Sequence, residues 1–307
     1  MQSPRFDKQS STPESGTPED RSRRDFVALS AAAGLAAVAG AAAAPACGAE
    51  TAVVEKDVQI ATPDGLCEAA FFHPATGRHP AVLIWTDAFG LRPSFRDMGR
   101  RLAAEGYAVL VPNPFYRVAK SPVLGDISSF DFSKDSDRAK LTPLMSSIQA
   151  PGAVERDASA FVPFLFAQGA VDAGRKMGVQ GYCMGGPLMM RTAAAFPDKV
   201  GAGASFHGGG LVTDKPESPH LLAPRIKARL YIAVAANDDA RDPEAKDKLR
   251  AAFAAAKVQA EIEVYPGAQH GWCVPDMPAR NGQPIYSRPD AERAWAKLLA
   301  LYRTALA

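Results

Sequence analysis

The sequence of 307 residues has little of several features that mark common functional classes. Lysine and arginine total 35 against 33 aspartates and glutamates, so the net charge is only +2. Nucleic-acid-binding domains carry a strong basic excess, and this near balance argues against that class. The sequence also contains no G-x-x-x-x-G-K-[ST] phosphate loop, no clustered metal-ligand motif and no internal repeat. It therefore predicts neither a cofactor nor a metal.

Cysteine is scarce too, with four residues and no C-x-x-C pair. That pair is the usual mark of dithiol redox proteins, so a redox function using Cys183 with Cys273 is the weaker alternative. Four cysteines in an exported protein leave a Cys67–Cys273 disulfide open. Cys67 is expected in a hairpin far along the sheet, however, and we expect free thiols.

Residues 1–49 differ from the rest in composition. Residues 2–25 are rich in Ser, Pro, Thr and charge and are predicted to be disordered. The stretch from Arg21 then combines a basic start, an Ala-rich apolar run and an A-x-A sequence at 44–46, the layout of a secretory signal. Ser22 to Val27 resembles the twin-arginine export motif. This predicts the twin-arginine machinery as a partner and a periplasmic or secreted protein.

Two other interpretations of this segment are weaker. An uncleaved signal would anchor the chain in the membrane, but alanine is only weakly hydrophobic and no charge cluster follows to stop transfer. Lipid attachment at Cys47 is conceivable, but the preceding residues lack the leucine-containing box of lipoproteins.

Residues 50–307 alternate between expected strands and helices and form one predicted domain. The expected strands are a hairpin at 53–74 with its turn at 63–65, then 81–86, 107–113, 175–182, 201–208, 228–238 and 260–267. The expected helices are 93–106, 155–169, 187–197, 243–257 and 289–306, and 117–150 is expected to be a long loop with short helices. This alternation predicts an α/β fold with a mostly parallel eight-stranded sheet and helices on both faces.

The stretch G-Y-C-M-G at 181–185 places Cys183 where a strand gives way to a helix. A structural interpretation is a plain strand-to-helix turn around a small buried residue. The pattern G-x-C-x-G is also the cysteine form of the nucleophile elbow, which presents its central side chain at the carboxyl edge of a parallel sheet.

Two further residues fit a catalytic triad with Cys183. Asp238 and His270 each follow an expected strand, and the order Cys–Asp–His is that of the α/β-hydrolases. Asp239 or Asp242 is an alternative acid, and His207 also stands at a strand end.

The backbone supplies the expected oxyanion hole. The N–H of Met184 opens the helix after the nucleophile, and the N–H of Ala88 follows the strand 81–86. Both are therefore expected to point at the oxygen of the tetrahedral intermediate.

Four stretches together resemble the dienelactone hydrolase (carboxymethylenebutenolidase) family, a cysteine branch of the α/β-hydrolases. They are "GYCMGG", "AANDD", "AQHGW" and "TDAFGLRPSFRDMGRRLAAEGYAVLVPNPFYR". The resemblance runs from about Val53 to the C-terminus. It implies the α/β-hydrolase fold and Cys183, Asp238 and His270 as the triad.

The resemblance also implies residues that act on the thiol and the substrate. Asp87 stands where the family has a glutamate that interacts with the resting thiol, and it is one methylene shorter. Val274 stands where family members that act on dienelactone carry an arginine that binds the substrate carboxylate. Arg138 matches the family's other arginine, and with Tyr116 it is a candidate for substrate binding. Arg280 is a possible replacement for the missing arginine.

The expected function is hydrolysis of activated esters or lactones through a thioester acyl-enzyme. A thiolate leaves a tetrahedral intermediate more easily than an alkoxide, so the reaction goes forward only with a good or protonated leaving group. Enol lactones and aryl esters qualify. The expected partner is thus a small ester or lactone, and a monomer is compatible with the sequence. A non-catalytic binding protein on the same fold is the other alternative.

Overall fold

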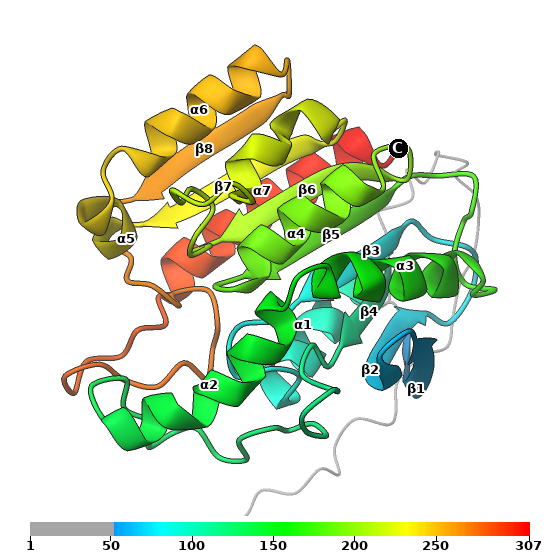
Figure 1. Cartoon of the computed structure of the whole chain (residues 1–307). Helices are drawn as coiled ribbons and strands as arrows, with labels where there is room; N and C mark the ends of the chain where they lie inside the picture. The colour runs from blue at the N-terminus through cyan, green and yellow to red at the C-terminus, as the bar shows by residue number, and fades with distance from the viewer. Residues whose placement is uncertain (1–51) are drawn as a thin grey trace, which may run out of the picture. The chain divides into compact units, whose positions relative to one another are not determined.

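The computed structural model describes residues 52–307, so the expected export signal and Cys47 lie outside the described residues. Eight strands form one sheet in the order β1-β2-β4-β3-β5-β6-β7-β8 (Figure 1). Their bounds are β1 Val53–Thr62, β2 Gly65–Pro74, β3 Ala81–Trp85, β4 Ala108–Pro112, β5 Met177–Tyr182, β6 Val200–Phe206, β7 Arg229–Ala235 and β8 Ala260–Tyr265.

The sheet is mostly parallel, as predicted. β2 pairs antiparallel with β1 and with β4, and the pairs from β4 through β8 are all parallel. Ligands of such sheets bind beyond the carboxyl ends of the parallel strands. Cys183, Asp238 and His270 follow the carboxyl ends of β5, β7 and β8 at that edge.

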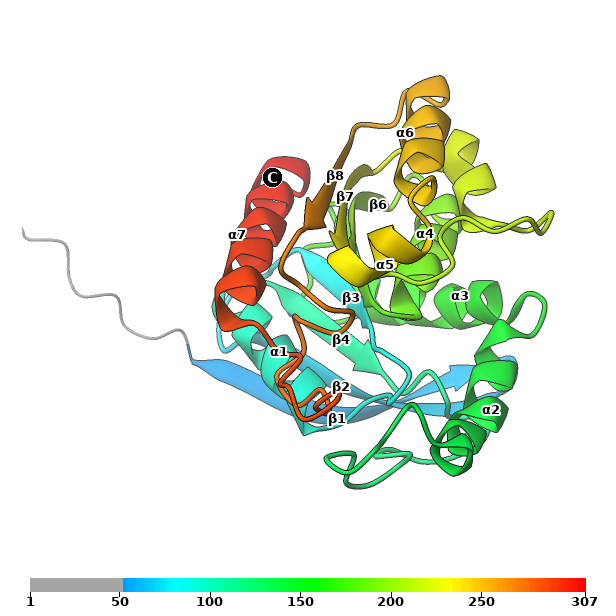
Figure 2. The same cartoon turned by 90° about the vertical axis from the view of Figure 1, so that its left-hand side faces the viewer.

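Helices cover both faces of the sheet. Their bounds are α1 Pro93–Ala104, α2 Asp135–Gln149, α3 Ala153–Phe166, α4 Gly185–Ala195, α5 Ala236–Arg241, α6 Ala245–Ala255, α7 Arg288–Ala305 and the 3₁₀ helix η1 Pro219–Arg225. α1 and α7 pack on one face, and α3, α4 and α6 pack on the other (Figure 2). β3 and β4 are buried along their whole length between these layers, which explains their uninterrupted apolar sequences.

The segment 117–150 departs from the expected loop. Its second half forms α2, a helix of 15 residues that buries Leu141, Leu144 and Ile148 at helical spacing. Pro143 lies within the helix and interrupts the pattern, so the sequence did not reveal its length. Among residues 52–307, no helix is both long and apolar enough to cross a membrane.

Candidate active site

Cys183 stands on a strained turn directly after β5. Its φ is +54°, in the left-handed region that non-glycine residues rarely adopt. A Cβ on Gly181 would lie 1.9 Å from the carbonyl oxygen of Gly185, and a Cβ on Gly185 would lie 2.5 Å from the carbonyl oxygen of Trp85. Neither position has room for a side chain, because the backbone segments lie too close together, so both must be glycine. The turn has the geometry of a nucleophile elbow, with Cys183 partly exposed at its tip.

Asp238 and His270 meet at the same edge of the sheet. The Nδ1 atom of His270 lies 2.6 Å from Oδ2 of Asp238, and the backbone N–H of His270 donates to Oδ1 of Asn237 at 2.8 Å. Asn237 thus fixes the loop that carries His270, a role that the sequence did not suggest. Asp239 binds Lys246 instead, so of the acids considered it is Asp238 that contacts the histidine.

The surroundings of His270 favour its charged form. Burial lowers the pKa of His270, but the charge and hydrogen bond of the Cys183 side chain and the Asp238 carboxylate outweigh burial and raise it to about 10. A histidine that is protonated at neutral pH stabilises a neighbouring thiolate. The arrangement therefore favours a protonated imidazole on His270.

Met184 and Ala88 lie where an oxyanion hole requires backbone donors. Met184 is the N-cap of α4, directly after Cys183, and Ala88 follows β3. Within residues 52–307, neither N–H takes part in the hydrogen bonds of turns and loops. Both residues are nearly buried, and a buried donor without a partner suits an oxygen that becomes negative during reaction.

A cavity of about 970 Å³ opens beside Cys183. Its walls come from α2, the start of α3, the first turns of α4, and the segment 209–219. Nothing in residues 52–307 forms a cluster of three or more side chains suited to a metal ion. The site thus places the Cys183 thiol and the His270–Asp238 pair beside an organic-sized space.

The sequence matches the model of the "Dienelactone hydrolase family" over residues 67–306. The chain belongs to this family. It is a member of a hydrolase family, and the structure gives it the α/β-hydrolase fold.

Relatives agree with this membership, and a solved structure agrees with the fold. A protein of Methylorubrum extorquens with the provisional name carboxymethylenebutenolidase is 29% identical over 92% of both chains. The carboxymethylenebutenolidase of Rhodococcus opacus is 29% identical over 64% of this chain and 71% of its own. A crystal structure from Klebsiella pneumoniae, provisionally called a dienelactone hydrolase, superposes with a TM-score of 0.68 at 23% identity. It covers 82% of this chain and 99% of its own.

Asp87 does not follow the behaviour expected from the dienelactone hydrolase family. Both of its carboxylate oxygens accept hydrogen bonds from Arg92, at 2.7 and 2.9 Å, and one also accepts from the N–H of Phe89. Within the described residues, no hydrogen bond joins Asp87 to Cys183. The short side chain is held by its own turn, and the structure does not bring it to the thiol.

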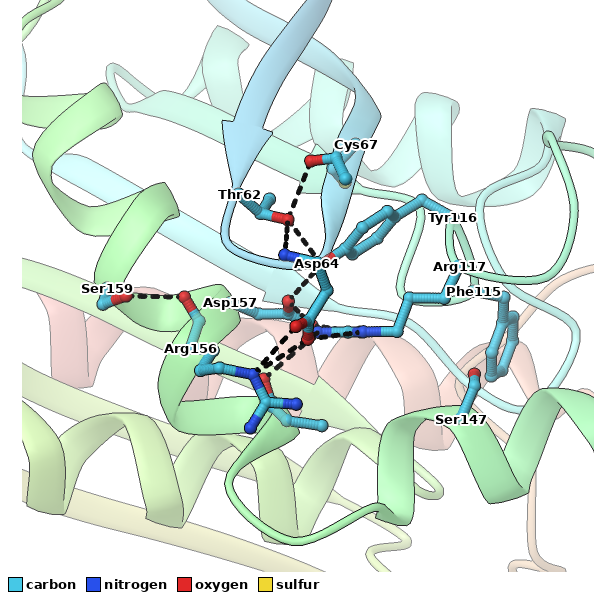
Figure 3. Close-up of polar contacts among 12 residues, drawn as sticks. Thr62, Asp64, Cys67, Phe115, Tyr116, Arg117, Ser147, Arg156, Asp157 and Ser159 are labelled. Carbon is cyan, nitrogen blue, oxygen red and sulfur yellow. Dashed lines mark hydrogen bonds and ion pairs between the residues drawn. The ribbon is translucent and has the colours of Figure 1, made fainter.

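Tyr116 lies in a polar cluster away from Cys183. Its hydroxyl donates to Oδ1 of Asp157 at 2.8 Å and shares a hydrogen bond with Thr62, while Arg117 binds Asp157 and Asp64 (Figure 3). This cluster joins the β1–β2 hairpin to α3, and Tyr116 does not line the Cys183 cavity. A substrate-binding role for Tyr116 has no support in this placement.

The two arginine candidates also lie outside the cavity. Arg138 is exposed on α2, where it binds Asp135 and the carbonyl oxygen of Phe132. Arg280 is exposed in the loop before α7 and pairs through its backbone with Gln283. Neither lines the cavity, and Val274 is fully buried among the residues beneath α7. The carboxylate-binding arginines expected of dienelactone hydrolases are thus not assembled here.

The remaining cysteines are separated by the sheet. Cys67 packs on the face of α3 and α4, and Cys273 packs on the face of α1 and α7. All three cysteines among residues 52–307 are free thiols. The structure therefore does not bring Cys183 and Cys273 together as a redox pair would require.

Proposed function

We propose that this chain hydrolyses activated carboxylic esters and lactones, such as aryl esters and enol lactones. In the proposal Cys183 is the nucleophile, His270 the acid and base, and Asp238 the residue that orients His270. The hydrogen bond between Asp238 and His270, at the sheet edge where the elbow presents Cys183, carries the proposal. The relatives named above, a carboxymethylenebutenolidase among them, support it.

Acylation begins with attack of the Cys183 thiolate on the carbonyl carbon of the ester. A carbon–sulfur bond forms, and the carbonyl electron pair moves to the oxygen, where the N–H groups of Met184 and Ala88 stabilise the negative charge. The electron pair returns, the bond to the leaving oxygen breaks, and His270 gives that oxygen its proton. The products of this step are an alcohol, phenol or enol and a thioester on Cys183.

Deacylation follows the same steps, with water as the nucleophile. Neutral His270 takes a proton from water as its oxygen attacks the thioester carbon. The carbon–sulfur bond then breaks, the carboxylic acid leaves, and Cys183 and His270 return to their starting pair. Asp238 keeps Nδ1 bonded throughout, so Nε2 remains the nitrogen that exchanges the proton.

The substrate preference follows from the nucleophile. In the tetrahedral intermediate the thiolate is a better leaving group than an alkoxide, so plain alkyl esters return to substrate. Aryl and enol oxygens stabilise the negative charge that develops on them as the bond breaks, so the reaction goes forward.

The test uses para-nitrophenyl acetate with the wild type, Cys183→Ala and a matched control, Cys67→Ala. We expect Cys183→Ala to lower kcat/KM at least about a thousandfold, while the control keeps its activity. Mass spectrometry of quenched wild type should find an acetyl group on the peptide that contains Cys183. Equal activity of the wild type and Cys183→Ala would refute the proposed nucleophile.

We also propose that residues 1–49 direct export through the twin-arginine pathway. The basis is the sequence motif around Arg23 and Arg24 and the A-x-A sequence that follows. Replacing both arginines by lysine should leave the chain in the cytoplasm of a bacterial host, as fractionation and immunoblotting would show. Export of the double variant at the wild-type level would contradict the proposal.

A further inference from the structure

Much of the wall of the Cys183 cavity is apolar. Its walls include Met184 and Leu188 from α4, Met145 and Ile148 from α2, and Val154 from α3. All but Met145 are buried, so these side chains are held by their neighbours and form a packed apolar surface. A surface of this kind binds hydrocarbon groups and gives no hydrogen bonds to a polar one.

Two of the four charged residues that line the cavity are paired with each other. Arg191 binds the carboxylate of Glu155 at 3.2 Å and the carbonyl oxygen of Glu217 at 2.9 Å. Lys215 also borders the cavity, but it is exposed to solvent at the mouth. Of the two cations that line the cavity within residues 52–307, Arg191 is therefore paired and Lys215 is exposed, and Val274 is buried elsewhere.

The position of the cavity identifies which half of the substrate it holds. Cys183 and Met184 line it, whereas His270, Asp238 and Ala88 do not. The histidine must stand beside the leaving oxygen to protonate it. The cavity therefore extends from Cys183 on the side of the acyl group.

We propose that this cavity binds an uncharged, apolar acyl chain and makes the enzyme selective for medium-length or aromatic acyl esters. The inference rests on the proposed function and adds the substrate class. A volume of about 970 Å³ exceeds the needs of an acetyl group by a wide margin. Each methylene that is buried in such a site raises kcat/KM by up to about fourfold.

The first experiment compares para-nitrophenyl acetate, butyrate and hexanoate with the para-nitrophenyl monoester of adipic acid. The adipate ester has the chain length of hexanoate but ends in a carboxylate. We expect kcat/KM to rise at least about tenfold from acetate to hexanoate, and to fall at least about tenfold from hexanoate to adipate. Equal values along the series, or faster hydrolysis of the adipate, would overturn the inference.

The second experiment changes the cavity itself. Met145 is only partly buried, so Met145→Trp should fold while its ring fills the acyl space. We expect the ratio of hexanoate to acetate hydrolysis to drop at least about tenfold, and Met145→Ala to extend the preference to octanoate. Leu66→Trp, at an exposed position on β2, is the matched control and should keep the wild-type ratio. An unchanged ratio in Met145→Trp would locate the acyl group elsewhere.

The outcomes separate this inference from the proposed function. Wild type that hydrolyses acetate through Cys183 without any chain-length preference overturns the acyl cavity alone. Wild type that hydrolyses none of the esters overturns the proposed function, and the acyl cavity with it.

Discussion

Arg92 holds both carboxylate oxygens of Asp87, through Nη1 at 2.7 Å and Nη2 at 2.9 Å, and both side chains are buried. The same guanidinium binds Asp276, which lies in the loop after His270. Asp87 also accepts the N–H of Phe89, so its carboxylate shapes the turn that carries Ala88. Arg92 therefore ties the proposed oxyanion loop to the histidine loop.

Removing Arg92 should be costly because it leaves a buried carboxylate without a partner. We expect Arg92→Leu to lower the free energy of unfolding by about 3–5 kcal/mol. The exposed pair Arg250–Asp247 offers a matched control, and Arg250→Leu should cost less than about 1 kcal/mol. Urea denaturation of the three proteins measures the difference. Equal losses of unfolding free energy in the two variants would show that the buried Arg92–Asp87 pair stabilises the fold no more than the exposed pair does.

The pH dependence of the reaction should follow the charge on His270. Because its pKa is raised to about 10, the ring keeps its proton below that pH and loses it above. Phenyl acetate needs this proton for its leaving group, so its kcat/KM should fall as the pH rises through about 10. Para-nitrophenyl acetate, whose leaving group departs as an anion, should show a weaker fall.

Asp238→Asn provides the control for this assignment. Without the carboxylate, the pKa of His270 should drop, and the alkaline limb for phenyl acetate should move to lower pH. Stopped-flow rates between pH 6 and pH 11 would locate both limbs. A wild-type limb near the ordinary histidine pKa, at about 6.5, would contradict the proposed ion pair.

The turn at Cys183 and the meeting of Asp238 with His270 could be predicted because their signals are local. Gly181, Cys183 and Gly185 lie within five residues, and the parallel sheet brings strand ends together in a known order. Asp87 was a different case. Its neighbour is set by Arg92, whose other partner, Asp276, lies 184 residues further along the chain. Sequence position placed an acid after β3 but did not reveal which group would bind it.

The substrate-binding roles expected for Arg138 and Tyr116 could not be judged from the sequence for the same reason: the partners of a side chain can be distant in the chain. Tyr116 lies after β4 as expected, but Thr62 and Asp157 bind its hydroxyl from the hairpin and from α3. These partners are 41 and 54 residues from Tyr116 in the sequence, so no local pattern around Tyr116 predicts them. The acyl cavity was equally hidden, because it depends on a helix, α2, whose pattern is interrupted by Pro143.

The cluster around Asp157 should support the wall of the cavity. Asp157 is fully buried, and burial raises its pKa although Arg117 and Tyr116 both bind it. We expect Asp157→Ala to lower the free energy of unfolding by about 3–5 kcal/mol, because it leaves Arg117 and Tyr116 without their shared acceptor. Asp157→Asn keeps an acceptor oxygen and should cost less. Guanidinium denaturation compares the two, and an Asn variant as unstable as the Ala variant would refute the assignment.

His207 is the last residue whose contacts predict an effect on the reaction. The backbone N–H of Cys183 is shared between Nδ1 of His207, at 3.2 Å, and the carbonyl oxygen of Phe206, at 3.0 Å. The ring of His207 stands edge-on to His270 with centroids 4.8 Å apart. Burial and the nearby charge of His270 hold the pKa of His207 well below its usual range, so it stays neutral beside the proposed ion pair. A neutral acceptor at this point stabilises the strained turn at Cys183 without competing for the proton of His270.

Two substitutions separate the acceptor from the ring. His207→Asn keeps an oxygen near the position of Nδ1 and tolerates the residue's φ of +41°, whereas His207→Phe keeps a ring but has no acceptor. We expect kcat for para-nitrophenyl acetate to fall about tenfold or more in His207→Phe and clearly less in His207→Asn, with KM little changed in both. Rates are normalised to titrated Cys183 thiol, and thermal denaturation checks that both variants fold. If His207→Phe retained more activity than His207→Asn, the contribution of His207 would be the packing of its ring against His270 and not its hydrogen bond to Cys183.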